Sequence, residues 1–400
     1  MRILLIHQNF PGQFRQLSGV LIERGHDVVA IGRRQGVMPE GLTYGLYGID
    51  ELMPDWPGSD RHIELALRRA QQVLRASLLL REQGWIADAV LFHSSWGEGL
   101  YLRDVWPEQR LVAYPELFGS ARVMGYGFDQ SLGPVPGELL ISMHHLNLLS
   151  LSAIADSDAL ICPTHYQLNT FPSHLRQNFH VIHEGVDTKL LGPYPERCLV
   201  LGPELLLRPG DPVVTYCSRH LEPLRGFPTM MRAVALLQQC HASVQVIIVG
   251  ENGKGYGPAS AHPGGHQGAL LEELQDQLDL ERIHFLGRVE YEQLIGIFQV
   301  SAAHVYLTYP YALSWSLLEA MACGAPVVGS RGLPVEEVIQ AGVNGLVVDF
   351  NSPQSLCQAL LHLLEDRALA ARLAAAGRAT VEQHYELQAC ADAYEELLRG

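Results

Sequence analysis

The residues best suited to chemistry lie in one segment near the C-terminal end, from Tyr309 to Val328. The segment contains a polar loop, a helical pattern carrying Glu319, a glycine at 324 and an apolar run typical of a buried strand. A loop that leads into a helix presents unpaired backbone N–H groups and the positive end of the helix dipole. Such a junction suits a phosphate or diphosphate. Glu319 would then lie close enough to accept hydrogen bonds from a ribose, although an ordinary helix feeding a sheet shows the same pattern.

The run Leu317-Leu-Glu-Ala-Met-Ala-Cys-Gly-Ala-Pro-Val-Val328 resembles the signature of the family-4 retaining glycosyltransferases, enzymes of the two-domain GT-B fold (glycosyl transferases group 1). That family carries two glutamates separated by seven residues. Glu319 takes the place of the second glutamate, and Tyr311 takes the place of the first. The resemblance implies a donor-binding set made of Tyr311, Leu313, Ser314, Trp315, Ser316 and Glu319. The tyrosine predicts either a changed preference for sugar hydroxyls or a loss of activity.

Two arginines follow the apolar run Val213-Val-Thr-Tyr-Cys217, in the stretch Arg219-His-Leu-Glu-Pro-Leu-Arg225-Gly226. In the family an arginine occupies this place, and a lysine before glycine follows it. A planar guanidinium can bind a diphosphate through two hydrogen bonds. The resemblance therefore implies that Arg219 and Arg225 are catalytic groups that neutralise the diphosphate, whereas solitary arginines after a strand are usually surface charges.

Three further residues are expected to bind the donor. Gly250 opens the turn Gly250-Glu-Asn-Gly253, which resembles the glycine-rich turn of the family. Arg288 and Val289 follow Phe285-Leu-Gly287 and resemble the loop whose backbone contacts the base. Glycine-bearing loops are the usual connections in this architecture, so their order and spacing relative to Glu319 carry the prediction.

The N-terminal part offers Gly12 and His93. Gly12 lies in the first loop after a strand, where the missing side chain lets the backbone approach a phosphate or sugar, and it is expected to bind the donor. His93 ends the strand pattern Ala87–His93, where many relatives hold a histidine that faces the donor sugar. A neutral imidazole there can donate to or accept from a hydroxyl, so His93 is assigned to catalysis. The chain has 18 histidines, and a structural role is the alternative.

Strand, loop and helix patterns alternate from residue 2 to 162 and again from 213 to 349, which predicts an α/β protein with parallel sheets. We expect the GT-B arrangement of two Rossmann-like domains facing across a cleft. Residues 1–192 form the acceptor-side domain, 193–211 the hinge and 212–380 the nucleotide-sugar-binding domain. By resemblance, a helix at about 381–400 packs back on the first domain.

The composition limits the class of protein and the partners and metals that it can bind. With 400 residues, 48% hydrophobic and 18% charged, the chain is globular and long enough for two or three domains. The net charge of −15 argues against a nucleic-acid partner. Seven cysteines without a Cys-x-x-Cys pair argue against zinc and a disulfide framework. Asp156-Ser-Asp158 is interpreted as a helix end, and we expect no metal and no cofactor beyond the nucleotide sugar as co-substrate.

The cellular location is predicted from two features. No apolar stretch approaches the ~18–20 residues that span a bilayer, and no signal-peptide pattern opens the chain. A cytoplasmic protein is expected. Arginines among apolar residues from Arg61 to Arg81 predict an amphipathic helix that contacts the anionic inner face of the cell membrane. A solvated helix face is the alternative.

The expected activity is metal-independent transfer of a sugar, with retention, from a nucleotide-diphosphate sugar to a hydroxyl acceptor. The acceptor is a glycan, a lipid-linked molecule or a small molecule, as in polysaccharide biosynthesis. Two alternatives stay open: a non-catalytic nucleotide-sugar-binding partner, which would never turn over, and an epimerase, which would alter the donor without an acceptor. The loop 254–268 is either a mobile lid or a surface excursion.

Overall fold

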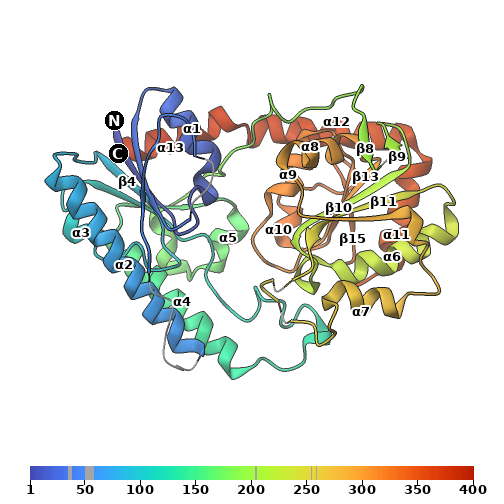
Figure 1. Cartoon of the computed structure of the whole chain (residues 1–400), viewed down its shortest axis with the longest axis horizontal. Coiled ribbons are helices and arrows are strands. Elements are labelled where there is room, and N and C mark those ends of the chain that lie inside the picture. The colour runs from blue at the N-terminus through green and yellow to red at the C-terminus, as the bar shows by residue number, and fades with distance from the viewer. Residues whose placement is uncertain (35–37, 50–57, 203–204, 254, 258) are drawn as a thin grey trace. The chain divides into compact units, whose positions relative to one another are not determined.

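The structure is a computed structural model that describes residues 1–34, 38–49, 58–202, 205–253, 255–257 and 259–400. The chain forms two compact units, each built around its own sheet (Figure 1). The first unit comprises Met1–Ala121, Gly133–Asp187 and Tyr385–Gly400, and the second comprises Arg122–Leu132 and Thr188–His384. The sequence placed all of residues 1–192 in the first domain, whereas the structure groups residues 122–132 and 188–192 with the second unit.

The first unit contains a parallel sheet of seven strands in the order β3-β2-β1-β4-β5-β6-β7. The strands are β1 Arg2–Ile6, β2 Asp27–Gly32, β3 Thr43–Leu46, β4 Ala89–His93, β5 Arg110–Tyr114, β6 Ala159–Cys162 and β7 Phe179–Val181. Its helices are α1 Arg15–Glu23, α2 Gly58–Glu82, α3 Leu102–Val105, α4 Gly137–Asp156, α5 His165–Thr170 and α13 Leu387–Arg399. Side chains of α1 and α13 pack on one face and those of α2, α3 and α4 on the other. Burial on both faces explains the nearly continuous apolar runs of the central strands.

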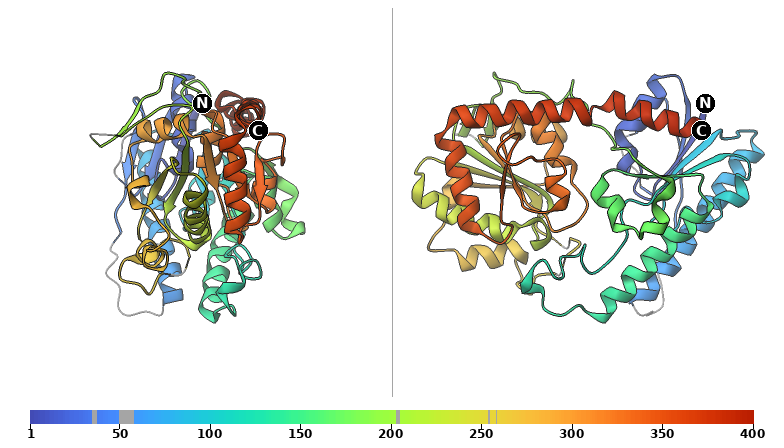
Figure 2. Two further views of the ribbon diagram at one scale, coloured as in Figure 1. Left: turned by 90° about the vertical axis from the view of Figure 1, so that its right-hand side faces the viewer. Right: turned by 180° about the vertical axis from the view of Figure 1, so that it is seen from behind.

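The second unit contains a parallel sheet of six strands in the order β12-β11-β10-β13-β14-β15, with helices on both faces (Figure 2). The strands are β10 Val213–His220, β11 Gln245–Glu251, β12 Ile283–Gly287, β13 Ala303–Tyr306, β14 Val327–Ser330 and β15 Leu346–Val348, and a separate antiparallel pair is formed by β8 Leu199–Leu201 and β9 Leu205–Leu207. The helices are α6 Phe227–Cys240, α7 Gly265–Glu273, α8 Tyr291–Val300, α9 Trp315–Ala322, α10 Leu333–Glu336, α11 Pro353–Glu365 and α12 Arg367–His384.

Both sheets share one topological feature, a reversal of strand order beside the first strand. In the first unit β1 lies between β2 and β4, and in the second β10 lies between β11 and β13. Loops on the two sides of such a switch point diverge, and ligands of open α/β sheets bind in the crevice at the carboxyl ends of these strands. The loops after β1, β4, β10 and β13 are therefore the places where functional residues are expected.

A segment from the first half of the chain is built into the second unit. The carboxylate of Asp129 accepts a hydrogen bond from the Tyr309 hydroxyl. The ring of Phe128 contacts Tyr309 and Phe350, with centroids 5.9 and 5.3 Å apart. Partial burial works to raise the pKa of Asp129, but the hydrogen bonds from Tyr309 and Ser131 hold it below its usual value. Residues 122–132 thus fix Tyr309, the residue that precedes the predicted donor loop.

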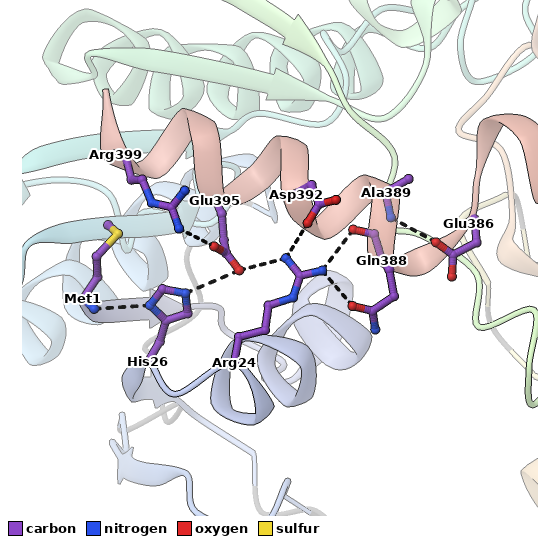
Figure 3. Close-up of polar contacts among 9 residues, drawn as sticks. All are labelled: Met1, Arg24, His26, Glu386, Gln388, Ala389, Asp392, Glu395 and Arg399. Atoms are coloured by element: carbon purple, nitrogen blue, oxygen red, sulfur yellow. Dashed lines mark hydrogen bonds and ion pairs between the residues drawn. The ribbon is translucent and has the colours of Figure 1, made fainter.

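The final helix, α13, is held on the first unit by an ion-pair network (Figure 3). Arg24, at the end of α1, donates through Nη1 to Asp392 at 2.7 Å and to Glu395 at 2.8 Å. Glu395 also lies 3.4 Å from His26 Nε2 and 2.6 Å from Arg399 Nη2. The Glu395 side chain is 9% exposed and that of Asp392 is 72% exposed. The two carboxylates therefore share a partner but differ in solvation.

We expect Glu395→Ala to destabilise the docking of α13 by about 2 kcal/mol and Asp392→Ala by less than about 0.5 kcal/mol, because exposed pairs are screened by water and poorly solvated ones are not. Hydrogen exchange of the α13 amides measures both values. Equal effects of the two substitutions would show that burial does not decide the strength of this network.

A buried histidine makes the second unit sensitive to acid. His304 in β13 is fully buried, and its Nδ1 lies 2.9 Å from Thr215 Oγ1. Burial lowers the pKa of His304 from 6.5 to about 3. Between these values the unfolded chain binds a proton that the folded protein does not, so the free energy of unfolding falls as the pH falls, by ~1.4 kcal/mol per pH unit. Above pH 6.5 the group has no effect on the slope.

We therefore expect His304→Leu to flatten the pH dependence of unfolding between pH 6 and 4 by about 1 kcal/mol per pH unit. Urea unfolding of the second unit at a series of pH values measures the slope. His174→Asn, at an exposed position, is the control and should leave the slope unchanged. Parallel curves for wild type and His304→Leu would contradict the assignment.

The predicted basic helix lies within α2, and several of its arginines contact residues of their own unit. Arg68 pairs with Glu64 at 2.8 Å, Arg69 donates to the carbonyl of Trp96, and Arg81 donates to the carbonyl of Val105. Of the helices in the described ranges, none is long and apolar enough to cross a membrane. Contact with a membrane surface stays a prediction, with part of the positive charge already engaged within the unit.

Candidate functional site

In the second unit the two predicted arginines and the predicted loop before α9 lie at the switch point. Arg219 lies at the end of β10, and Arg225 ends the short helix Pro223–Arg225 that follows it. The loop that contains Tyr311 to Ser314, and the start of α9 with Trp315 and Ser316, follow β13, the strand on the other side of the switch. Because β10 and β13 are hydrogen-bonded neighbours, two sequence segments about ninety residues apart form one site.

Arg225 is held in place by the loop after β13. Its Nη1 donates to Thr308 Oγ1 at 2.8 Å, to the carbonyl oxygen of Ala312 at 3.2 Å and to the Tyr306 hydroxyl at 3.3 Å. Its guanidinium carbon lies 5.7 Å from the centre of the Tyr311 ring. Arg225 thus holds the loop after β13 in place and also contributes a positive charge to the site.

Arg219 is oriented differently. Its side chain is exposed, and its Nη1 lies 3.5 Å from the Tyr256 hydroxyl, at the limit of a hydrogen bond. The structure therefore gives Arg219 little share in the stability of the unit and leaves its charge accessible to a ligand.

The start of α9 is partly engaged in internal hydrogen bonds. The N–H of Ser314, which precedes the helix, donates to the Tyr306 hydroxyl at 2.7 Å, so this amide is not available to a phosphate in the structure as it stands. Ser314 is among the residues predicted to bind the donor, and its role there stays a prediction. The hydroxyl oxygens of Ser314 and Ser316 lie 3.1 Å apart, while Leu313 and Trp315 are half-buried beside them.

Glu319 lies one turn into α9 and is 9% exposed. Its Oε1 accepts a hydrogen bond from the Tyr291 hydroxyl at 2.9 Å, which orients the carboxylate. Burial, with the nearby charge of Glu319, raises the pKa of Cys217 to about 12 and that of Cys323 to about 12. Both thiols are therefore protonated at neutral pH.

The remaining predicted donor residues follow the outer strands. Gly250 lies in β11 next to β10, where an added Cβ would come within 2.7 Å of the Ser218 carbonyl oxygen. Arg288 and Val289 follow β12, the edge strand of the sheet, with Arg288 exposed and Val289 half-buried. These two residues therefore lie two strands away from the switch point.

In the first unit His93 ends β4 and is fully buried. Its ring stacks on Trp96 with centroids 4.1 Å apart, and its Nε2 lies 3.2 Å from Glu116 Oε2. Glu116 has a φ of 54°, a left-handed conformation that is rare for a residue with a side chain. Its carbonyl oxygen accepts a hydrogen bond from the Gln167 amide at 3.1 Å, which helps to hold this backbone. A strained glutamate next to His93 is a feature of functional sites.

Gly12 lies at the other side of the first switch point, and its neighbour is a second histidine. The ring of His7 fills the space where a Cβ at position 12 would lie. His7 Nε2 is 2.6 Å from Gln13 Oε1, and the ring lies 5.1 Å from that of His93. Burial and the neighbouring His93 lower the pKa of His7 to about 3, so His7 is neutral at physiological pH.

The sequence missed several residues of these two sites: His7, Trp96, Glu116, Glu222, Tyr256 and Tyr306. His7 carried a usable signal, because it directly follows a buried strand. The others reach the sites through pairings that no local pattern contains.

A cavity of about 530 Å³ lies elsewhere in the second unit, near Asp211, Ala302 and Pro326. These residues precede the amino ends of β10, β13 and β14. The cavity is therefore at the opposite edge of the sheet from Arg219, and it is separate from the site described above.

Two Rossmann-like units with predicted functional residues at their switch points define the GT-B class. Comparison with protein families agrees: residues 24–191 match the Glycosyl transferase family 4 group, and residues 203–380 match the Glycosyl transferases group 1. The chain belongs to the family-4 glycosyltransferases of GT-B fold.

Two similar proteins act on lipid-linked mannosides. A GDP-mannose-dependent monoacylated alpha-(1-6)-phosphatidylinositol monomannoside mannosyltransferase of Corynebacterium glutamicum is 28% identical over 61% of this chain and 62% of its own length. A GDP-mannose-dependent alpha-(1-6)-phosphatidylinositol monomannoside mannosyltransferase of Mycobacterium tuberculosis is 24% identical over 100% of this chain and 98% of its own length. The first match spans less than two thirds of that relative.

Solved structures show the same fold. Sucrose-phosphate synthase from Thermosynechococcus elongatus superposes with a TM-score of 0.74 at 18% identity, covering 100% of this chain and 98% of the other. HepE of Anabaena, in complex with UDP-glucose, gives a TM-score of 0.68 at 17% identity, covering 100% and 99%. At these identities the likeness establishes the GT-B fold and no more.

Proposed function

We propose that the protein transfers a hexosyl or related sugar from a nucleotide-diphosphate sugar to a hydroxyl acceptor, with retention at the anomeric carbon and without a metal ion. The observation that carries the proposal is the site after β10 and β13. Arg219 and Arg225 there supply two permanent positive charges after β10, and Arg225 is hydrogen-bonded to the loop that leads into α9, the helix of Glu319. This set has the chemistry to bind a diphosphate and a ribose.

The proposed chemistry is electrostatic. As the bond between C1 of the sugar and the diphosphate oxygen breaks, negative charge grows on the leaving diphosphate, and Arg219 and Arg225 stabilise it. Preorganised charges of this kind are usually the largest contribution to enzymatic rate enhancement. The acceptor oxygen forms its bond to C1 from the same face, and its proton passes to the leaving phosphate. No separate general base is then required.

His93 is proposed to contact the sugar through its imidazole, with Glu116 and Trp96 fixing the ring. The names of the similar proteins support GDP-mannose and UDP-glucose as first donors to test, and lipid-linked mannosides as first acceptors. Contact of α2 with a lipid surface would suit such acceptors and is part of the proposal.

The test is a panel of UDP-, GDP- and ADP-sugars offered with glycan and lipid-linked acceptors. Transfer, or slow hydrolysis of one donor, is the expected result, and Glu319→Ala should weaken it. NMR of the product reports the anomeric configuration, and activity in EDTA reports metal independence. The proposal fails if no donor is transferred or hydrolysed and Glu319→Ala behaves as wild type. Binding without turnover would indicate a nucleotide-sugar-binding partner, and a changed donor without acceptor would indicate an epimerase.

A further inference from the structure

The loop after β11 reaches the two arginines of the donor site through a buried clamp. Glu222, between Arg219 and Arg225 in sequence, is only 3% exposed. Its carboxylate accepts hydrogen bonds from the backbone N–H of Gly257 at 2.7 Å and of Tyr256 at 3.3 Å. It also fills the space where a Cβ at position 255 would lie, so a side chain there would displace the carboxylate. Burying a carboxylate is costly unless it is hydrogen-bonded, so this clamp places residues 255–257 firmly.

The hydrogen bonds from Glu222 do not bury Tyr256 in the core, because the Tyr256 side chain is exposed. Tyr256 is 54% exposed, and its hydroxyl lies 3.5 Å from Arg219 Nη1. Its ring lies 5.7 Å from that of Tyr311 at an interplanar angle of 40°. Tyr311 in turn lies under the guanidinium of Arg225 at 5.7 Å. Two aromatic rings therefore stand between the two arginines.

The position of Tyr256 and Tyr311 beside the two arginines indicates which part of a bound donor they would contact. A nucleotide sugar carries its sugar directly on the second phosphate, so a diphosphate held by Arg219 and Arg225 leaves the sugar within reach of the rings beside them. Tyr311 also takes the place of the first of the family's two glutamates. An aromatic ring cannot act as that charged acceptor, but it can pack against the C–H face of a pyranose ring.

We propose, resting on the function proposed above, that Tyr256 and Tyr311 form an aromatic platform that binds the pyranose ring of the donor through its C–H face, with Glu222 positioning the platform. The site thereby selects the sugar by the shape of its C–H face. Its selectivity depends less on individual hydroxyls than that of a site with a carboxylate at position 311. The segment 255–257 is part of the donor site rather than a surface excursion.

The experiment measures how much the sugar adds to binding. Affinities of the full chain for UDP and UDP-glucose, and for GDP and GDP-mannose, are determined by calorimetry. Tyr256→Ala should weaken the binding of the nucleotide sugar roughly tenfold, the size of one aromatic contact, and change the affinity for the free nucleotide less than about twofold. Tyr256→Phe keeps the ring and should bind as wild type. Glu222→Gln should show the same sugar-specific loss, since it weakens the clamp.

Tyr194→Ala, which removes another exposed tyrosine of the second unit, is the matched control. Equal losses for the free nucleotide and the nucleotide sugar would overturn the platform and assign the loop to the diphosphate. Unchanged affinities in Tyr256→Ala would overturn it as well. If wild type binds nucleotide sugars and Tyr256→Ala matches it, the platform alone fails. If wild type binds none of the four compounds and none of the ADP-sugars, the proposed function fails and the platform with it.

Discussion

Arg219→Ala is expected to lower kcat/KM for transfer by roughly 10²–10³ while leaving the melting temperature unchanged. The rate effect follows from removing one preorganised positive charge from a developing anion, for which mutagenesis of other enzymes gives losses of this size. The stability effect is small because Arg219 is exposed and its closest polar contact is the 3.5 Å approach to Tyr256. Exposed substitutions without a buried partner usually change stability by less than about 0.5 kcal/mol.

Two variants sharpen this prediction. Arg219→Lys should recover part of the activity, because lysine keeps the charge but not the planar pair of donors. Arg232→Ala, in the same unit, removes a partly exposed arginine paired with Glu273 at 2.7 Å and should retain wild-type activity. Steady-state kinetics and thermal unfolding measure all three. Full activity in Arg219→Ala would remove this residue from the site.

Arg225→Ala is expected to lose activity to a similar or greater degree and to destabilise the second unit by about 1–3 kcal/mol. Its Nη1 donates to Thr308 Oγ1, the carbonyl of Ala312 and the Tyr306 hydroxyl. Without the guanidinium of Arg225, these three acceptors lose their common hydrogen-bond donor. Polar groups left without a partner in this way cost about 1–3 kcal/mol of stability. The loop that carries Tyr311 and leads into α9 would lose its anchor.

Thr308→Val separates the two effects. It removes the 2.8 Å hydrogen bond and leaves the arginine in place, so it should reproduce part of the stability loss with activity reduced far less. Thermal unfolding of the second unit and kcat/KM are the measurements. If Thr308→Val and Arg225→Ala lower activity equally, the arginine acts through the loop and not through its charge.

Much of the fold was readable from the order of apolar runs and glycine-bearing loops. Parallel strands buried on both faces leave nearly uninterrupted apolar stretches, such as Arg2–Ile6 and Gln245–Glu251, and each is followed by a loop and a helical pattern. Residues at strand ends could be chosen on the same basis. This is why Gly12, His93, Arg219 and the loop after β13 were all placed beside strands that the structure brings to the switch points.

The contacts that tie these residues together could not be predicted. Glu222 clamps residues 34 and 35 positions further on, Glu116 pairs with His93 from 23 positions away, and Asp129 reaches Tyr309 across 180. None of these pairings follows from helix or strand periodicity, because periodicity reports only which face of an element is buried. For the same reason no local pattern assigns residues 122–132 to the unit of Tyr309, where the structure groups them.

The sequence by itself determined that this is a two-unit α/β protein and that Tyr311 stands where its family has a carboxylate, and it predicted a phosphate-binding loop-to-helix junction before Glu319. Only the tertiary structure decided that Tyr311 has an aromatic neighbour, Tyr256, and that Arg219 stands accessible while Arg225 is anchored. The physical reason is that residue types and local spacing set the elements, whereas strand order and the burial of polar groups between loops depend on how the whole unit packs.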